Sequence, residues 1–300
     1  DVCECGLGMK RGSDRARMTV AKLMEQGLSC TCCTDEMKAL FTQWLENKED
    51  AKITREVADK LIPLCESCGC DVCKGLVEYK TFIPARCQWI IGGDGASYDI
   101  GYGGLDHVLA SGENVNILVL DTEVYSNTGG QSSKATPAGA IAKFAASGKR
   151  VRKKDLGMMA MSYGYVYVAQ VAMGANQAQF LNAIKEAEAH DGPSLIIAYA
   201  PCINHGLKGG MAGAQNEIKR AVEAGYWHMY RFNPELKEAG QNPFTLDSKE
   251  PTANFRDFLL SEVRYSALQR TFPEIAEELF VETEKNAKDR LESYKKLAQG

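Results

Sequence analysis

Residues 88–104 read QWIIGGDGASYDIGYGG, a short apolar run followed at once by a stretch with six glycines and one early carboxylate, Asp94. Glycines this dense, placed after a buried strand, indicate a backbone that must approach a ligand closely. Gly93-Asp94-Gly95 lacks the third glycine of a dinucleotide fingerprint, and no Gly-Lys-Ser/Thr of a Walker phosphate loop follows. The stretch therefore predicts a ligand that suits an acidic, glycine-rich loop.

Three further apolar runs follow along the chain, at residues 114–123, 165–174 and 193–201. Short, nearly continuous apolar runs that alternate with helical or glycine-rich segments are typical of strands in a parallel sheet covered on both faces. The sequence thus predicts an α/β fold with a mostly parallel sheet and flanking helices.

Residues 176–192, NQAQFLNAIKEAEAHDG, predict one of the crossover helices. Asn176 is a suitable N-cap, and Gly192-Pro193 ends the segment. The helical period places four apolar residues on one face, namely Ala178, Leu181, Ile184 and Ala187.

The change in character along the chain predicts three parts. Residues 1–86 form a cysteine-rich helical segment (part of the same domain or an insertion), 87–230 an α/β core, and 231–300 a helical extension that ends in a long charged helix. Within the first part, a helix is expected to begin at a Ser13 cap and to stop at Gly27.

Composition and charge narrow the classes of function. The chain has 300 residues, 45% of them hydrophobic, and a net charge of −4, which gives no reason to expect nucleic acid or an anionic membrane as partner. No apolar run approaches the roughly 18 residues that span a bilayer. The chain begins with Asp1 and shows no signal-peptide pattern, which indicates a processed chain or a fragment of a longer one.

The sequence contains 11 cysteines, and all but Cys202 lie before residue 90. An odd count argues against a closed disulfide framework and favours a reducing, cytoplasmic compartment. The string CESCGCDVC supplies Cys65, Cys68, Cys70 and Cys73 within nine residues, enough soft ligands for Zn²⁺ or iron–sulfur. Metal ligation and mutually unconnected thiols both remain open.

Asp94 would repel a bare phosphate unless a divalent cation lay between them. Mg²⁺ takes about six oxygen ligands, commonly one or two carboxylates, neutral oxygens and the phosphates of the substrate. One crossover unit of roughly 30 residues further on, Thr122 and Asn127 follow the next predicted strand. Because parallel strands end at the same edge of a sheet, the two clusters predict one site for a magnesium-bridged diphosphate.

This combination of a GDG stretch and an Asn-bearing turn is similar to the thiamine-diphosphate motif. The longer strings GDGASYDIGYGGLDHVLASGENVNILVLDTEVYSNTGGQ (93–131) and YAPCINHGLKGGM (199–211) resemble one family that carries it. That family is pyruvate:ferredoxin (or flavodoxin) oxidoreductase, also called pyruvate synthase. The resemblance lies in the C-terminal thiamine-diphosphate-binding domain, and it implies the thiamine-diphosphate-binding fold.

Carried over by position, the resemblance implies roles for single residues. Asp94 resembles the Mg²⁺-binding carboxylate, flanked by Gly93 and Gly95 of the cofactor-binding motif. Thr122 resembles a side-chain ligand of the ion, and Val124 the residue that offers its backbone carbonyl. Asn127 corresponds to the catalytic amide near the reacting carbon and the diphosphate. The chain departs from the family at Ala96, where an aromatic residue is expected.

The resemblance also implies a [4Fe–4S] cluster close to the thiamine, held by four cysteine thiolates. Cys202 matches one of them. The family's other ligands come from a C-x-x-C pair and a further cysteine earlier in the domain, and this chain has no copy of those segments. Either the missing ligands lie upstream on a longer chain or local cysteines substitute.

The implied activity is oxidative decarboxylation of pyruvate with coenzyme A to acetyl-CoA and CO₂, a reaction of anaerobic metabolism. Electrons would leave through iron–sulfur clusters to ferredoxin or flavodoxin. The residues that activate the cofactor and grip pyruvate lie in another domain of the family, so the chain is expected to form half a site within a larger, homodimeric enzyme.

Two alternatives accompany this interpretation. The chain could be a non-catalytic iron–sulfur or zinc-binding redox subunit, with the cysteine-rich front as its working part. Separately, the basic run KRVRKKD, residues 149–155, is either a solvated loop or a surface that receives an acidic electron carrier.

Overall fold

The computed structural model describes residues 2–300, which form two compact units. One unit is Gly6–Gln88, and the other joins the residues up to Cys5 with Trp89–Gly300. The segments 87–230 and 231–300 therefore contribute to one compact unit, with only residues 87 and 88 outside it. No bilayer-spanning helix is found among the described residues.

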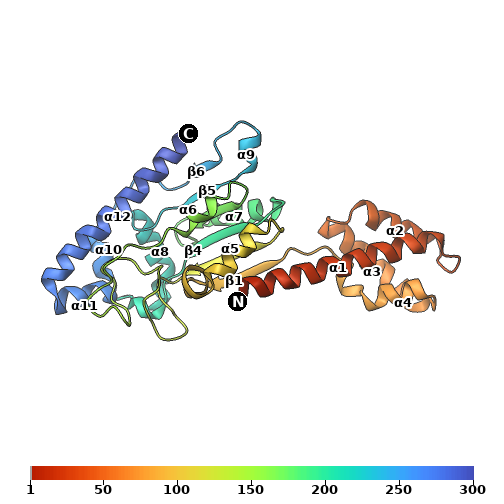
Figure 1. Ribbon diagram of the computed structural model, residues 1–300, viewed down its shortest axis with the longest axis horizontal. Coiled ribbons are helices and arrows are strands. Elements are labelled where there is room, and N and C mark those ends of the chain that lie inside the picture. The colour runs from red at the N-terminus through yellow and green to blue at the C-terminus, as the bar shows by residue number, and fades with distance from the viewer. Residues whose placement is uncertain (1) are drawn as a thin grey trace. The chain divides into compact units, whose positions relative to one another are not determined.

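The larger unit is built on one mixed sheet of six strands in the order β1-β2-β4-β3-β5-β6 (Figure 1). The four apolar runs form strands that pair in parallel, β1 (Trp89–Gly93), β2 (Asn116–Asp121), β3 (Tyr167–Val171) and β4 (Ser194–Tyr199). Two short antiparallel strands extend the sheet, β5 (Tyr230–Phe232) and β6 (Phe244–Leu246). The predicted α/β class with a mostly parallel sheet is confirmed.

Helices accompany this sheet on the chain after each strand. They are α5 (Tyr102–Ala110), α6 (Leu156–Met161), α7 (Gln177–Ala189), α8 (Ala214–Glu223), α9 (Glu235–Glu238), α10 (Phe255–Ser261), α11 (Val263–Thr271) and α12 (Pro273–Gln299). The long α12 packs against α11 and β6 (Figure 1). Segment 231–300 is thus not purely helical, because β6 joins the sheet.

The predicted crossover helix α7 is confirmed, but its buried face is only partly the predicted one: Ala187 is buried and Ile184 packs against the core, whereas Ala178 is exposed. The Asn176 side chain accepts a hydrogen bond from the Gln179 backbone N–H, as an N-cap does. Buried positions are Gln179, Ala183 and Ala187, whereas Leu181 is 54% exposed. Burial of the polar Gln179 is possible because its amide donates to the Gln170 carbonyl and to Asp247.

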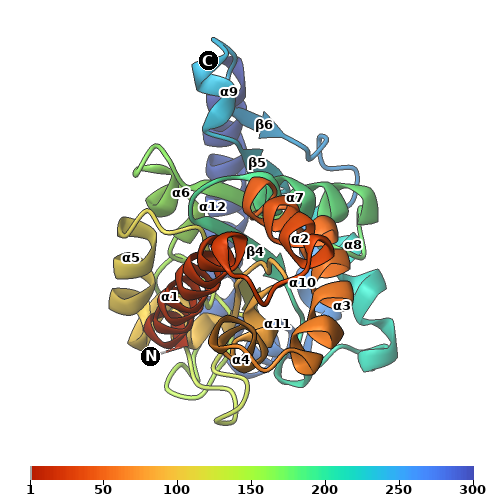
Figure 2. The same ribbon diagram turned by 90° about the vertical axis from the view of Figure 1, so that its right-hand side faces the viewer.

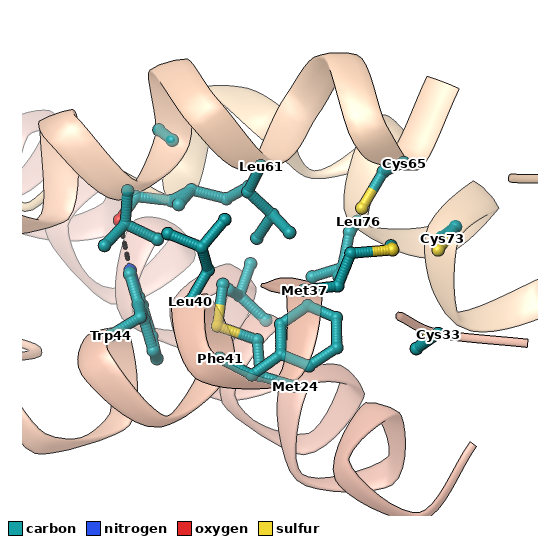
Figure 3. Packing of buried hydrophobic residues seen from close by; sticks show 14 residues of the cluster. Met24, Cys33, Met37, Leu40, Phe41, Trp44, Leu61, Cys65, Cys73 and Leu76 are labelled. Carbon is teal, nitrogen blue, oxygen red and sulfur yellow. Dashed lines mark hydrogen bonds between the residues drawn. The ribbon is translucent and has the colours of Figure 1, made fainter. Parts of the chain in front are cut away.

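The smaller unit is helical (Figure 2), and it has its own core of buried residues. It holds most of α1 (Val2–Ser29), then α2 (Asp35–Glu46), α3 (Ala51–Ser67) and α4 (Asp71–Glu78). Ser13 lies inside α1, so the predicted cap at that residue is wrong. Figure 3 shows the core, in which Phe41 and Leu61 are fully buried and the Trp44 indole donates to the Ile83 carbonyl over 2.7 Å.

Candidate functional site

A cavity of about 310 Å³ opens where β1 and β2 end. The parallel register pairs Gly93 with Leu120, so the residues that follow the two strands emerge side by side. All six residues predicted to bind the cofactor line this cavity: Gly93, Asp94, Gly95, Thr122, Val124 and Asn127. The structure therefore brings together the two polar clusters that the sequence placed one crossover apart.

Three kinds of oxygen converge at the floor of the cavity. The Thr122 hydroxyl lies 2.7 Å from Asp94 Oδ1 and 2.9 Å from the Val124 carbonyl oxygen. A carboxylate, a hydroxyl and a backbone carbonyl are hard donors of the type that Mg²⁺ prefers. The donor set fits a magnesium ion chemically.

Ser133 is a residue of this site that sequence reasoning missed. Its buried hydroxyl donates to Asp94 Oδ2 over 2.6 Å and accepts from the Ala135 backbone N–H over 3.1 Å. Both carboxylate oxygens of Asp94 are thus held by hydroxyl groups. The string QSSKATP gives no sign of this role, because the contact depends on how the chain returns after the turn at 125–131.

The electrostatic environment of Asp94 favours a nearby cation. Burial, followed by the neighbouring charge of Asp121, raises the pKa of Asp94 to about 6, although the hydrogen bonds from Ser133 and Thr122 act in the opposite direction. A buried carboxylate with a raised pKa is stabilised in its charged form by an added positive charge. The site is therefore prepared for a cation rather than for an anion alone.

The glycine-rich stretch is not the open loop that the sequence suggested. After Asp94 the chain makes a π-helical turn over Gly95–Ile100 and then enters α5. Short π-helical segments often occur at functional sites. Gly95 has no room for a side chain, because its β-carbon would overlap the Tyr125 ring, whereas a β-carbon at Gly93 would meet no atom within 4 Å.

Asn127 lies exposed in a tight turn at the edge of the cavity. The turn is closed by a hydrogen bond of 2.8 Å from the Gly130 backbone N–H to the Tyr125 carbonyl. Gly130 has a φ of +87°, a value that glycine tolerates and other residues rarely adopt. This geometry presents the Asn127 side chain at the cavity rather than in the protein interior.

A network of buried charges lies behind the cavity, and its long-range partners were not foreseen from sequence. Lys153 contacts Asp121 over 2.7 Å and Glu123 over 3.0 Å. Arg264 contacts Glu123 and Glu262, each over 2.7 Å. The pairs of Asp121 and Glu123 join the end of β2 to residues 30 to 141 positions further along the chain.

The basic run 149–155 contains two lysines that make internal contacts, whereas Arg150 and Arg152 are exposed. Lys153 is 11% exposed and belongs to the buried network, and the Lys149 ammonium donates to the carbonyls of Ser133 and Thr136 over 2.7 Å each. For Lys149 and Lys153, the interpretation as a solvated loop and the interpretation as a docking surface are both wrong. They support the backbone on which Asp94 depends.

Cys202 lies beside the same edge of the sheet, after β4. Its Sγ accepts a hydrogen bond from the Asn204 backbone N–H over 3.3 Å, and His205 Nε2 lies 2.7 Å from the Thr122 carbonyl oxygen. The Cys202 segment is therefore tied to the cavity. Among residues 2–300, Cys202 belongs to neither of the two groups of clustered cysteines, which lie between residues 30 and 73.

Comparison with known proteins supports the resemblance found in the sequence. Residues 79–198 match the family model described as thiamine pyrophosphate enzyme, C-terminal TPP binding domain; thiamine pyrophosphate is the same compound as thiamine diphosphate. The chain is 57% identical over 300 residues to a pyruvate-flavodoxin oxidoreductase of Klebsiella pneumoniae, which covers 99% of this chain and 26% of the relative.

Two further relatives carry related names. A pyruvate:ferredoxin oxidoreductase of Moorella thermoacetica is 55% identical over 311 residues, which covers 100% of this chain and 26% of the relative. A mitochondrial NADP⁺-dependent pyruvate dehydrogenase of Euglena gracilis is 44% identical over 302 residues, which covers 100% of this chain and 17% of the relative. The resemblance to pyruvate oxidoreductases is confirmed, and the chain spans about a quarter or less of the length of these relatives.

Proposed function

We propose that this chain forms the thiamine-diphosphate and Mg²⁺ part of a pyruvate oxidoreductase. The reaction is oxidative decarboxylation of pyruvate with coenzyme A to acetyl-CoA and CO₂, with the electrons passed to ferredoxin or flavodoxin. The observation that carries the proposal is the convergence of Asp94, Thr122 and the Val124 carbonyl in one cavity, within the segment that matches the family model. Near-complete alignment of the chain with pyruvate oxidoreductases supports the choice of substrate.

In this proposal the residues of the chain mainly bind and orient. Asp94, Thr122 and the Val124 carbonyl hold Mg²⁺, and Ser133 keeps the Asp94 carboxylate in place. Gly93 leaves room for the diphosphate, and the backbone N–H of Gly95 would donate to it. Asn127 would contact the cofactor from the edge of the cavity. When bound, thiamine diphosphate supplies the electron sink for loss of CO₂ from a 2-oxo acid.

We assign Cys202 a separate role, as one thiolate ligand of a [4Fe–4S] cluster close to the cofactor. The contact of His205, three residues further on, with the Thr122 carbonyl supports this assignment, because it holds the Cys202 segment next to the cavity. A cluster needs four such ligands, and the described residues around Cys202 do not provide a grouped set. The remaining thiolates would come from outside this part of the chain.

The proposed enzyme needs partners for a complete site. Leu120 of β2 lines the cavity and is 40% exposed. Ile91 of the neighbouring strand β1 points to the same face of the sheet and is 57% exposed. Exposed apolar side chains at a binding cavity favour cover by another domain or subunit of the enzyme. We therefore propose that a homodimer or further domains complete the site, in the cytoplasm, with pyruvate, coenzyme A and ferredoxin or flavodoxin as partners.

The test is calorimetric titration of the intact protein with thiamine diphosphate, with and without Mg²⁺. We expect magnesium-dependent binding of one cofactor per chain, lost on addition of EDTA and weakened at least about 100-fold by Asp94→Asn, since a carboxylate ligand is removed. Asp106→Asn on α5, which removes a carboxylate outside the cavity, is the matched control. Equal affinity of Asp94→Asn and the wild type would reject the proposal and favour a non-catalytic metal-binding subunit.

A further inference from the structure

The helical unit places cysteines from two separate loops next to one another. Cys30 follows the end of α1, and Cys33 precedes the Thr34 cap of α2. Cys70 is the N-cap residue of α4, and Cys73 lies in the first turn of that helix. Two C-x-x-C pairs, nearly 40 residues apart in sequence, therefore meet at the ends of helices. This pairing does not depend on the proposed enzymatic function.

Within each of two groups of three cysteines, the sulfur atoms are close enough to bind one ion. Those of Cys30, Cys33 and Cys70 all lie within 4.8 Å of one another, and so do those of Cys68, Cys70 and Cys73. Cys70 belongs to both groups, so the two groups share one sulfur atom. The Cys68 thiol also donates to the Cys32 carbonyl over 3.8 Å, which ties the two loops together.

This set differs from the compact string of four cysteines that the sequence suggested. Cys65 is 2% exposed and packs in the apolar core with Leu61 and Leu76, and it belongs to neither group of clustered thiols (Figure 3). Cys33 and Cys73 lie at the same end of that core (Figure 3). The ligand set is therefore formed by tertiary contact between two loops and not by one local segment.

The spacing of the sulfur atoms favours a single ion over a cluster or a disulfide. Tetrahedral zinc with Zn–S bonds of about 2.3 Å places its sulfurs about 3.8 Å apart. In a four-iron cluster each thiolate binds a different iron, so its sulfurs are spread more widely. All of these cysteines are free rather than disulfide-bonded. The side chain of Cys70 also makes no capping hydrogen bond, which leaves its sulfur available.

We propose that Cys30, Cys33, Cys70 and Cys73 hold one structural Zn²⁺ ion in the helical unit. The ion ties the α1–α2 loop to the α3–α4 loop, with Cys68 beside it as a fifth thiol. Because ligands this far apart in sequence meet only in the folded chain, binding energy of the ion adds to the stability of the unit. The ion has no redox role and takes no part in the transfer of electrons.

The first experiment measures metals in the intact protein, purified without chelators from cells supplied with zinc. We expect about one zinc per chain by mass spectrometry of the metals, and X-ray absorption at the zinc edge that fits four sulfur ligands at about 2.3 Å. The double variant Cys33→Ser/Cys70→Ser is expected to lose this zinc, while its iron content stays unchanged. Cys5→Ser, which removes an exposed thiol outside both groups, is expected to keep it.

Cobalt provides a measurement that does not depend on whether the variant folds. The wild-type protein, with zinc exchanged for Co²⁺, is expected to show the visible d–d bands of a tetrahedral tetrathiolate. Absence of zinc from the wild type, retention of zinc in the double variant, or loss of iron in place of zinc would each overturn the proposal. So would a cobalt spectrum typical of octahedral oxygen ligands.

Discussion

At the scale of single residues, the buried carboxylate of Asp94 suits the binding of a cation but lowers the stability of the folded chain when no cation is bound. Its pKa is raised to about 6 by burial and by Asp121, so without a cation the folded chain disfavours the charged form. A group whose pKa is raised on folding lowers stability as the pH rises through the interval between its unfolded and folded pKa values. The carboxylate is nevertheless the ligand that an approaching Mg²⁺ needs. Strain of this kind is common where a site must bind a charged ligand.

The substitution Asp94→Asn tests this conflict. In EDTA, we expect the variant to gain stability relative to the wild type as the pH rises from about 4 to about 6, by about 1–2 kcal/mol at pH 8. The gain is smaller than the pKa shift alone implies, because an amide cannot accept from both Thr122 and Ser133. Urea unfolding at pH 5 and pH 8 measures the difference. A stability difference that is the same at both pH values would contradict the argument.

The same carboxylate predicts the pH dependence of cofactor binding. Because Mg²⁺ binds the deprotonated form, affinity for magnesium and thiamine diphosphate should fall about tenfold per pH unit below pH 6 and level off above it. Calorimetric titrations between about pH 5 and pH 8 measure this, after correction for protonation of the free ligand, which is titrated separately. A corrected affinity that stays constant over that range would show that Asp94 is not the titrating ligand.

What could be predicted about the site follows from which contacts are local. Asp94 and Thr122 could be recognised because each directly follows a strand, Asn127 because it lies in the turn soon after, and strand ends meet in a parallel sheet. Ser133 and Arg264 could not, because their places depend on how distant segments return to the sheet. Val124 was identified only from the motif resemblance. It contributes its backbone carbonyl, so the type of its side chain does not indicate this role.

At the scale of elements, the strands were predictable and the entry to α5 was not. Continuous apolar runs identify β1 to β4, and the central strands β3 and β4 are buried along almost their whole length. The π-helical turn at Gly95–Ile100 has no comparable signature, since glycine permits helix and loop alike. On α7, periodicity correctly predicted a helix and the burial of Ala187, but it missed Gln179, which is buried because its amide makes hydrogen bonds that a hydrophobic pattern does not reveal.

Two neighbouring glycines at the junction of β1 and the π-helical turn should respond differently to alanine. Gly95→Ala is expected to destabilise the fold by about 1–3 kcal/mol, because the new methyl group would displace the Tyr125 ring. Gly93→Ala should leave stability almost unchanged, since no atom lies within 4 Å, yet weaken cofactor binding by filling the cavity. Thermal unfolding and calorimetry distinguish the two effects. Equal destabilisation by both variants would contradict the described packing.

At the scale of the whole molecule, the charged network joins the cofactor site to the C-terminal helices. Glu123 follows β2, Lys153 precedes α6, and Arg264 lies in α11. Burial alone would raise the pKa of Glu123, but Lys153 and Arg264 outweigh it and hold that pKa at about 2. The carboxylate therefore stays charged in the interior. The C-terminal helices thus supply one of the two cations that neutralise the end of β2, where the Mg²⁺ ligands begin.

Removal of Arg264 should be the most damaging change in this network. Arg264→Met leaves Glu123 and Glu262 buried without their shared partner, which is expected to cost about 3–5 kcal/mol in chemical unfolding at pH 7. Arg256→Met, which breaks the exposed pair with Glu277, should cost about 0–1 kcal/mol and serves as the control.

The effect of Arg264 should also depend on pH. The folded-state pKa of Glu123 lies below its unfolded value, so the Arg264–Glu123 pair stabilises the wild type above about pH 4.5 and loses this effect as the pH falls towards 2. The difference between Arg264→Met and wild type should therefore narrow in acid. If the two arginine variants were equally stable at pH 7, the network would not connect the site to the C-terminal helices.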